Sequence, residues 1–311
     1  MRKDGRRVAL IPGEVFAMNF RRYIFAALLA IASVEGIAQT VATSDVLVRA
    51  TNGDVIAQNN LGHKYLVGDG VPVSCSEAAQ WFAKAASKDL PEALFNLGNL
   101  QLQGRGVRKD VRKAEKLFRQ AADRGFAPAQ NELGNMLSNG SLGKIDLVAA
   151  VQLYQTAASA GFAPALNNLG VMYATGRGVN ADLPKAASLY KQAADKGSAA
   201  AMNNLGNLLA AGRGVPQDLP GAVALFRASA EKGYAVAQVN LALAFAKGIG
   251  TERDATAALK WMIIAKASGE PLPAGLESEI FSQMEIATQK AGESEAQSWL
   301  ARHHATATSG F

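Results

Sequence analysis

The apolar positions of this chain recur with a period of 36 residues, and the recurrence holds for six periods. One column holds leucine in every period, and the next position holds glycine in the first five. Six copies without an insertion indicate an array of repeats, each of them one supersecondary unit. The leucines of this column are Leu61, Leu97, Leu133, Leu169, Leu205 and Leu241.

Each period predicts two helices joined by a short turn. In the second period, apolar residues such as Leu97 and Leu100 are three to four positions apart, which is the spacing of one helix face. Gly104 then ends this helix, because glycine adopts the left-handed conformation at little cost. Asp110 is a good N-cap for a second helix, which ends at Gly125.

The N-cap position of the second helix holds a similar residue in every period. A capping box is predicted where Ser74 precedes Glu77. Two periods depart from the pattern at a glycine: Leu142 replaces the second glycine of the loop, so that turn should differ, and Asp89 replaces the final glycine. The N-cap column is Ser74, Asp110, Asp146, Asp182, Asp218 and Asp254.

The glycine after each leucine lies in the middle of a predicted helix, where it costs about 1 kcal/mol relative to alanine. Its retention in five periods predicts that a neighbouring helix approaches closely there. A single period cannot bury its apolar face, whereas stacked repeats bury a continuous core. These glycines are Gly62, Gly98, Gly134, Gly170 and Gly206, and Ala242 follows in the sixth period.

The order A-x-x-x-L-G, G-x-G-V, D, A-x-x-L-[FY]-x-x-A-A-x-x-G resembles the SEL1-like repeat, a relative of the tetratricopeptide repeat. The resemblance covers residues 54–269 and implies an all-α, right-handed α-solenoid of six 36-residue helix–turn–helix repeats. Residues 39–53 form a short lead-in. Residues 270–304 are predicted to form a C-terminal helical cap, with helices over 276–291 and 294–304, and residues 305–311 a disordered tail.

The first 38 residues have the pattern of a secretory signal peptide. Arg21 and Arg22 precede an apolar run over 23–34, and the small residues Gly36 and Ala38 fit a cleavage site after Ala38. The run is shorter than the roughly 20 residues of a membrane-spanning helix. Translation starts at either Met1 or Met18, and the mature protein is expected to be periplasmic or secreted, without stable membrane insertion.

The net charge and the reactive residues of the sequence argue against several classes of function. The formal net charge is +6, and residues 1–38 account for half of it, so the electrostatic footprint of nucleic-acid binding is missing. Cys75 is the single cysteine, which excludes an intramolecular disulfide. We find no nucleophile motif, cofactor motif or metal-ligand set, and we predict a protein that is not an enzyme.

Amide side chains are the first candidate for partner binding. The resemblance implies that the first helix of each repeat lines the concave side of the solenoid. An amide offers two donors and two acceptor lone pairs, so a row of them suits the backbone of an extended partner. The alternative is a structural role, in which the asparagine before Leu-Gly bonds to the adjacent loop. The candidates are Asn60, Asn96, Asn99, Asn131, Asn167, Asn168, Asn203, Asn204 and Asn207.

Arginines between the loop glycines are the second candidate, since they would project from one rim toward acidic groups. The resemblance suggests an adaptor or regulator that binds a protein partner, such as the periplasmic domain of a signalling receptor or sensor kinase. It leaves two alternatives: a β-lactamase-like cell-envelope hydrolase and a scaffold for an envelope or polysaccharide-export complex. These arginines are Arg105, Arg177 and Arg213.

Overall fold

The computed structural model describes residues 43–282 and 284–308, and within these ranges the chain forms helices and no strands. The predicted signal peptide lies outside the described residues. The chain divides into a first unit, which ends at Lys88, and a second unit, which begins at Asp89. None of the helices in the described part is long and apolar enough to span a bilayer.

The first unit contains helical residues 43–51 and the two helices of the first repeat, α2 (Val55–Val67) and α3 (Cys75–Ala86). Ala50, Leu61 and Trp81 form its core together with Ala57. The buried Gln58 amide donates to the Ala50 carbonyl at 3.1 Å and so holds residues 43–51 against α2. The predicted lead-in is therefore partly helical.

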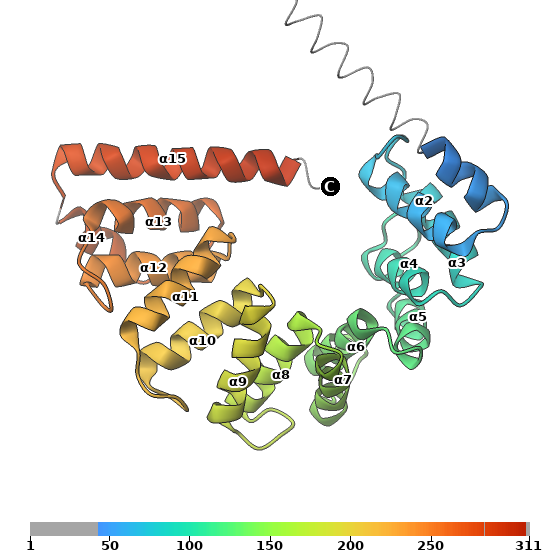
Figure 1. The fold of residues 1–311 in the computed structure, drawn as a ribbon, viewed down its shortest axis with the longest axis horizontal. Helices are drawn as coiled ribbons and strands as arrows, with labels where there is room; N and C mark the ends of the chain where they lie inside the picture. The colour runs from blue at the N-terminus through green and yellow to red at the C-terminus, as the bar shows by residue number, and fades with distance from the viewer. Residues whose placement is uncertain (1–42, 283, 309–311) are drawn as a thin grey trace, which may run out of the picture. The chain divides into compact units, whose positions relative to one another are not determined.

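The second unit is a succession of helix pairs, each packed against the next (Figure 1). The first helix of a repeat has an even number and the second an odd one. The second to sixth repeats consist of α4 (Pro91–Gln103), α5 (Val111–Asp123), α6 (Ala127–Asn139), α7 (Leu147–Ser159), α8 (Ala163–Thr175), α9 (Leu183–Asp195), α10 (Ala199–Ala211), α11 (Leu219–Glu231), α12 (Ala235–Lys247) and α13 (Ala255–Ala267). The all-α repeat fold predicted from the sequence is confirmed.

The aspartate column caps the second helices as predicted. The Asp110 carboxylate accepts the Lys113 backbone N–H at 2.9 Å, and the other four aspartates make the same bond. The capping box at Ser74 is only half formed: its hydroxyl accepts the Glu77 N–H, but its own N–H donates to the Tyr65 carbonyl. Each capping aspartate likewise donates its N–H to the preceding helix, which fixes the angle between the two helices of a repeat.

The mid-helix glycines make room for an aromatic ring, which confirms the predicted close approach. A Cβ built at Gly98 would lie 2.6 Å from Cε1 of Phe118, and the other four glycines face the ring of their own repeat in the same way. In the sixth repeat both positions change together. Ala242 replaces the glycine and Met262 replaces the ring, and both are buried.

The two departures from glycine have different consequences: the backbone keeps its conformation at Asp89 and changes in the loop at Leu142. Asp89 adopts a φ of 64° and so takes the left-handed conformation of the glycine that it replaces. In the loop between α6 and α7, the positive φ angles fall on Gly140 and Gly143 and not on Leu142. The predicted difference of this turn is confirmed.

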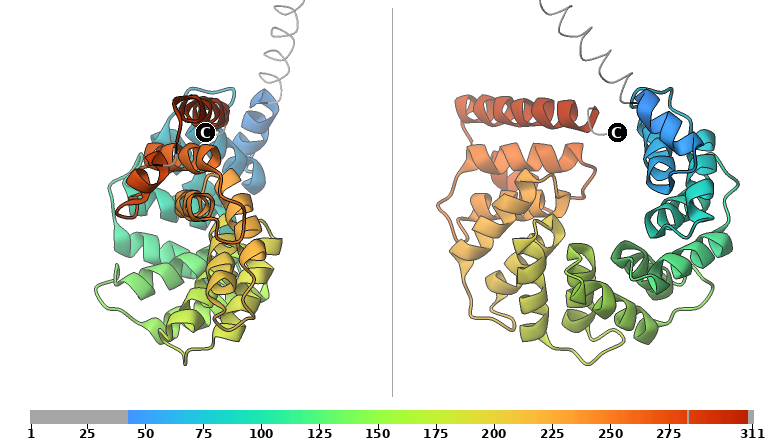
Figure 2. Two further views of the ribbon diagram at one scale, coloured as in Figure 1. Left: turned by 90° about the vertical axis from the view of Figure 1, so that its left-hand side faces the viewer. Right: turned by 45° about the vertical axis from the view of Figure 1, so that its right-hand side comes forward.

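The C-terminal helices differ from the prediction in their bounds. The first, α14, is short (Leu276–Phe281), and the second, α15, runs unbroken from Ile286 to Thr308. Two helices were expected, over 276–291 and 294–304, but Gly292 between them lies inside α15, where a Cβ would be 3.0 Å from the Thr256 carbonyl oxygen. It therefore permits close packing of α15 along α13 (Figure 2).

Tryptophan side chains anchor α15 to the last two repeats. The Trp299 ring is 4% exposed and packs edge-on against Trp261 of α13, with ring centroids 5.8 Å apart. Its Nε1 donates to the Glu231 carboxylate at the end of α11 at 3.0 Å. Trp299 thus serves as the apolar anchor of the cap.

Candidate protein-binding face

The asparagines of the first helices form hydrogen bonds between neighbouring repeats. Asn168 of α8 donates its amide to the side-chain oxygens of Asn131 and Asn135 of α6, at 3.0 and 3.1 Å. Asn204 of α10 donates to Asn167 in the same way at 3.0 Å. One asparagine of the fourth repeat and one of the fifth therefore reach back to the repeat before them.

The same bond recurs between the fifth and sixth repeats. Asn240 of α12 donates to Asn203 at 2.8 Å and to Asn207 at 3.4 Å. We call this series, from Asn131 to Asn240, the amide ladder. Asn203 is 2% exposed and Asn131 is 8% exposed, so these two predicted binding residues act inside the structure. Their role is structural, but they bond to the neighbouring repeat and not to the adjacent loop as the alternative supposed.

The ladder is interrupted where its acceptor is missing. Phe95 stands in the acceptor column of the second repeat, and Glu132, which has no amide to donate, follows in the donor column of the third. Glu132 instead accepts from Asn135 at 3.1 Å within α6. Asn96 and Asn99 lie half-buried on α4, and Asn60 is exposed on α2 in the first unit.

A partly buried polar cluster lies at the junction of the third and fourth repeats. The Tyr154 hydroxyl donates to Asn135 at 2.9 Å and lies 3.2 Å from the Ser138 hydroxyl. Burial raises the pKa of Tyr154 above the ordinary value of a tyrosine. Arg177 donates to the Ser138 carbonyl at 3.2 Å.

The three predicted rim arginines are exposed in their loops. Arg177 nevertheless contacts the preceding repeat through Ser138, so this side chain bridges two repeats. In the sixth repeat the arginine column holds Ile249, which is 41% exposed. This loop position therefore changes from arginine in the second, fourth and fifth repeats to an apolar residue in the sixth.

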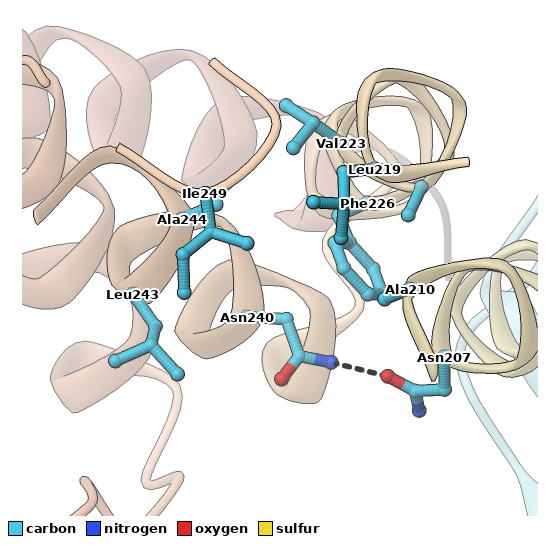
Figure 3. A pocket seen from close by; sticks show the side chains of 10 residues that line it. Asn207, Ala210, Leu219, Val223, Phe226, Asn240, Leu243, Ala244 and Ile249 are labelled. Atoms are coloured by element: carbon cyan, nitrogen blue, oxygen red, sulfur yellow. Dashed lines mark hydrogen bonds between the residues drawn. The ribbon is translucent and has the colours of Figure 1, made fainter. Parts of the chain in front are cut away.

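Ile249 lies at the edge of an apolar pocket with a volume of about 190 Å³ (Figure 3). The pocket is formed by α10, α11, α12 and the loop that follows α12. The ladder amides Asn207 and Asn240 lie along one side of it and are joined by their hydrogen bond. Its apolar lining is Ala210, Leu219, Ala222, Val223, Phe226, Leu243, Ala244 and Ile249.

The pocket arises because the sixth repeat departs from the other repeats at three lining positions. Ala244 occupies a column that holds leucine or methionine in the second to fifth repeats, so a large side chain is missing. Leu243 occupies a column that is mostly asparagine, and Ile249 occupies the arginine column. Sequence reasoning missed the pocket, although these three departures were visible in the columns.

In the part of the chain that the structure describes, few side chains are placed to bind a metal ion or to act in catalysis. Its residues include no group of three or more histidines, cysteines, aspartates or glutamates that would hold a metal ion. Cys75 is half-buried at the start of α3. The His303 ring stacks on Trp299, with centroids 3.5 Å apart, and so belongs to the packing of the cap.

The family model of the Sel1 repeat matches six consecutive segments: 55–90, 91–126, 127–162, 163–198, 199–234 and 235–270. No curated protein matches the chain. A Sel1 repeat protein from Oxalobacter formigenes is 35% identical with a TM-score of 0.66; the match covers 69% of this chain and 88% of that protein.

Two further solved structures are similar. A protective antigen of uropathogenic Escherichia coli strains, which displays an SLR fold, is 28% identical with a TM-score of 0.75. The match covers 85% of this chain but spans only 56% of the antigen. An immunity protein from Pseudomonas aeruginosa, 18% identical with a TM-score of 0.50, matches over 79% of this chain and 82% of its own length. At that identity it shows the fold alone.

Proposed function

Because this chain belongs to the Sel1 repeat family, we propose that it is an exported adaptor that binds a partner protein on the face formed by the first helices of its repeats. Stacked helical repeats present extended surfaces that suit protein recognition. More specifically, we propose that the protein is a regulator and that its partner is the periplasmic domain of a signalling receptor.

The apolar pocket is the observation that carries this proposal. It is comparable in size with one large apolar side chain, and it is open at Ile249. Protein interfaces gain most of their affinity where such an anchor side chain fills a pocket and excludes water. The repeat pattern would close this space with a leucine or methionine at position 244, and the chain leaves it open.

The amides beside the pocket suit the backbone of the same partner. Asn240 donates its amide to Asn203 and Asn207, and its oxygen and the Nδ2 of Asn207 point away from the apolar lining, beside the pocket (Figure 3). Such groups would orient a bound segment without requiring a particular sequence. Specificity would then come from the anchor side chain.

Export rests on the signal-peptide pattern of residues 1–38. The test is to express the full chain in a Gram-negative host and to analyse the periplasmic fraction by mass spectrometry. A mature N-terminus at Gln39 is expected. A cytoplasmic chain that retains residues 1–38 would refute export.

Partner binding is tested with a variant that restores the repeat pattern. Leu243→Asn, Ala244→Leu and Ile249→Arg together give the sixth repeat the residues that the fifth has in these columns. The variant should keep its thermal midpoint, since each residue already fits the fold elsewhere. Ile249→Val, which keeps the pocket apolar, is the matched control.

The readout is crosslinking in intact cells followed by identification of the captured protein. The native chain and the Ile249→Val control should capture the same envelope protein, and the triple variant should capture about tenfold less of it. Equal capture by the triple variant would exclude the pocket. Absence of any captured protein with the native chain would count against the adaptor function.

A further inference from the structure

Positive charge is concentrated on α5 and the loop before it. The segment 105–124 holds eight cationic and three acidic residues, a net charge of +5. All eight cationic side chains are exposed. They are Arg105, Arg108, Lys109, Arg112, Lys113, Lys116, Arg119 and Arg124.

This charge is specific to the second repeat. The equivalent segments of the other repeats have net charges of 0 (69–88), 0 (141–160), +2 (177–196), +1 (213–232) and +1 (249–268). The repeat fold therefore does not require it. A cluster of like charges also opposes folding through self-repulsion. The stability of the fold therefore does not explain why the second repeat carries this charge.

Two of the three acidic residues of the segment form contacts within it. Asp110 caps α5 through the Lys113 N–H, and Glu115 pairs with Arg119 at 2.7 Å. Arg124 pairs with Asp89 at 2.5 Å. Most of the remaining charge lies on five exposed residues, which we call the basic face: Arg108, Lys109, Arg112, Lys113 and Lys116.

A hollow adjoins the basic face at the loop between α6 and α7. In the fourth repeat, Gly178 lies against the first residue of the preceding second helix, where a Cβ would be 2.5 Å from the Leu147 carbonyl oxygen. Leu142 takes the place of that glycine in the third repeat, and a hollow of about 410 Å³ lies between this loop and α5. The regular loop of the fourth repeat also borders a hollow, beside Val148 of α7, so the charge and not the hollow distinguishes the second repeat. It is lined by Val111, Arg112, Glu115, Ser141, Leu142 and Gly143.

We propose that the basic face and this hollow bind an acidic segment of a partner protein, a short run of aspartate or glutamate residues. Arg112 presents a guanidinium fork for carboxylates, and the lysines add point charges. The hollow would admit neighbouring side chains of the segment. This surface lies on other helices than the apolar pocket, so the inference does not depend on the proposed function.

The extent of the charge favours an acidic peptide over a polyanion. A helix of 13 residues such as α5 is about 20 Å long. The equivalent segment of the third repeat is neutral and that of the fourth is only +2, so the charge does not continue as a track. Nucleic acids and anionic polysaccharides bind best along such a track, where many phosphates or carboxylates are neutralised together.

The test uses fluorescence anisotropy with the purified chain and a labelled peptide of six glutamates. The variant Arg112→Gln/Lys113→Gln/Lys116→Gln removes three charges from the basic face with residues that favour helix. The control Lys196→Gln/Lys232→Gln/Lys290→Gln removes three exposed charges from positions away from the basic face and the hollow. Circular dichroism checks that all three proteins have the same thermal midpoint.

We expect the basic-face variant to bind the peptide about tenfold more weakly, as for the loss of three exposed ion pairs, and the control to change less than twofold. Binding should weaken as salt is raised. An equal loss in both variants would overturn the proposal, as would absence of binding at low salt. Tighter binding of heparin or of a duplex DNA than of the peptide, at equal charge, would assign the surface to a polyanion instead.

Discussion

The packing of a glycine against a ring within each repeat makes a quantitative prediction for Gly98 and Phe118. In Gly98→Ala, the added Cβ would lie 2.6 and 2.8 Å from two ring carbons of Phe118, well inside the contact distance of about 3.5–4.0 Å. The Phe118 side chain is fully buried, so its ring has no free space to enter.

Two opposing effects set the magnitude. Overpacking of this kind costs about 1–3 kcal/mol. Alanine is about 1 kcal/mol better than glycine in a helix interior. Gly98→Ala should therefore destabilise the protein by up to about 2 kcal/mol. Without the steric clash, the same substitution should stabilise it by about 1 kcal/mol.

The sixth repeat supplies the compensating change, because alanine is paired there with Met262 and not with a ring. The double variant Gly98→Ala/Phe118→Met should consequently be more stable than the sum of its single variants by about 1–2 kcal/mol. The assay is equilibrium unfolding in urea, followed by circular dichroism, for all four members of the cycle. Ala242→Gly is the control, and it should lose only about 1 kcal/mol of helix propensity.

A stabilised Gly98→Ala variant with no coupling to Phe118→Met would refute the steric explanation of the glycine column.

Two further predictions concern Tyr190 and the amide ladder. Burial raises the pKa of Tyr190 to about 12, above the value of about 10 in the unfolded chain, so stability should be constant below about pH 10 and fall by up to about 2–3 kcal/mol as the pH rises toward 12. Tyr190→Phe, a residue found in this column in three other repeats, should reduce that fall in urea titrations at alkaline pH. Asn168→Ala should cost about 1–3 kcal/mol, because Asn131 and Asn135 lose their donor, whereas Asn180→Ala in an exposed loop should cost less than about 0.5 kcal/mol by the same measurement. Equal losses for Asn168→Ala and Asn180→Ala would contradict the ladder.

The repeat fold was predictable because each column reports a local requirement. Asp110 caps its own helix, and Gly98 accommodates the ring 20 residues later in the same repeat. Six copies make such short-range rules visible in one sequence. The bounds of α15 were not predictable, because Gly292 has the same local appearance whether it ends a helix or lets two helices approach.

The roles of the asparagines depended on contacts between repeats. Whether Asn168 faces a partner or reaches Asn131 is decided by how adjacent repeats stack, which no local pattern encodes. The pocket had a readable signal in Ala244 and Ile249, since both depart from their columns. A departure, however, gains meaning only when the neighbouring helices show the space that it leaves.

The amide ladder also bears on how an array of this kind changes its length. Asn204 reaches a residue 37 positions earlier, as do Asn168 and Asn240, so each bond is defined by the adjacent repeat and not by the place in the chain. Loss or duplication of a whole 36-residue unit would leave donors opposite acceptors. Insertion of a single residue into a first helix would rotate the following amide by about 100° and remove it from the ladder. We therefore expect the array to tolerate the gain or loss of whole repeats better than that of single residues, in keeping with six consecutive matches of 36 residues each.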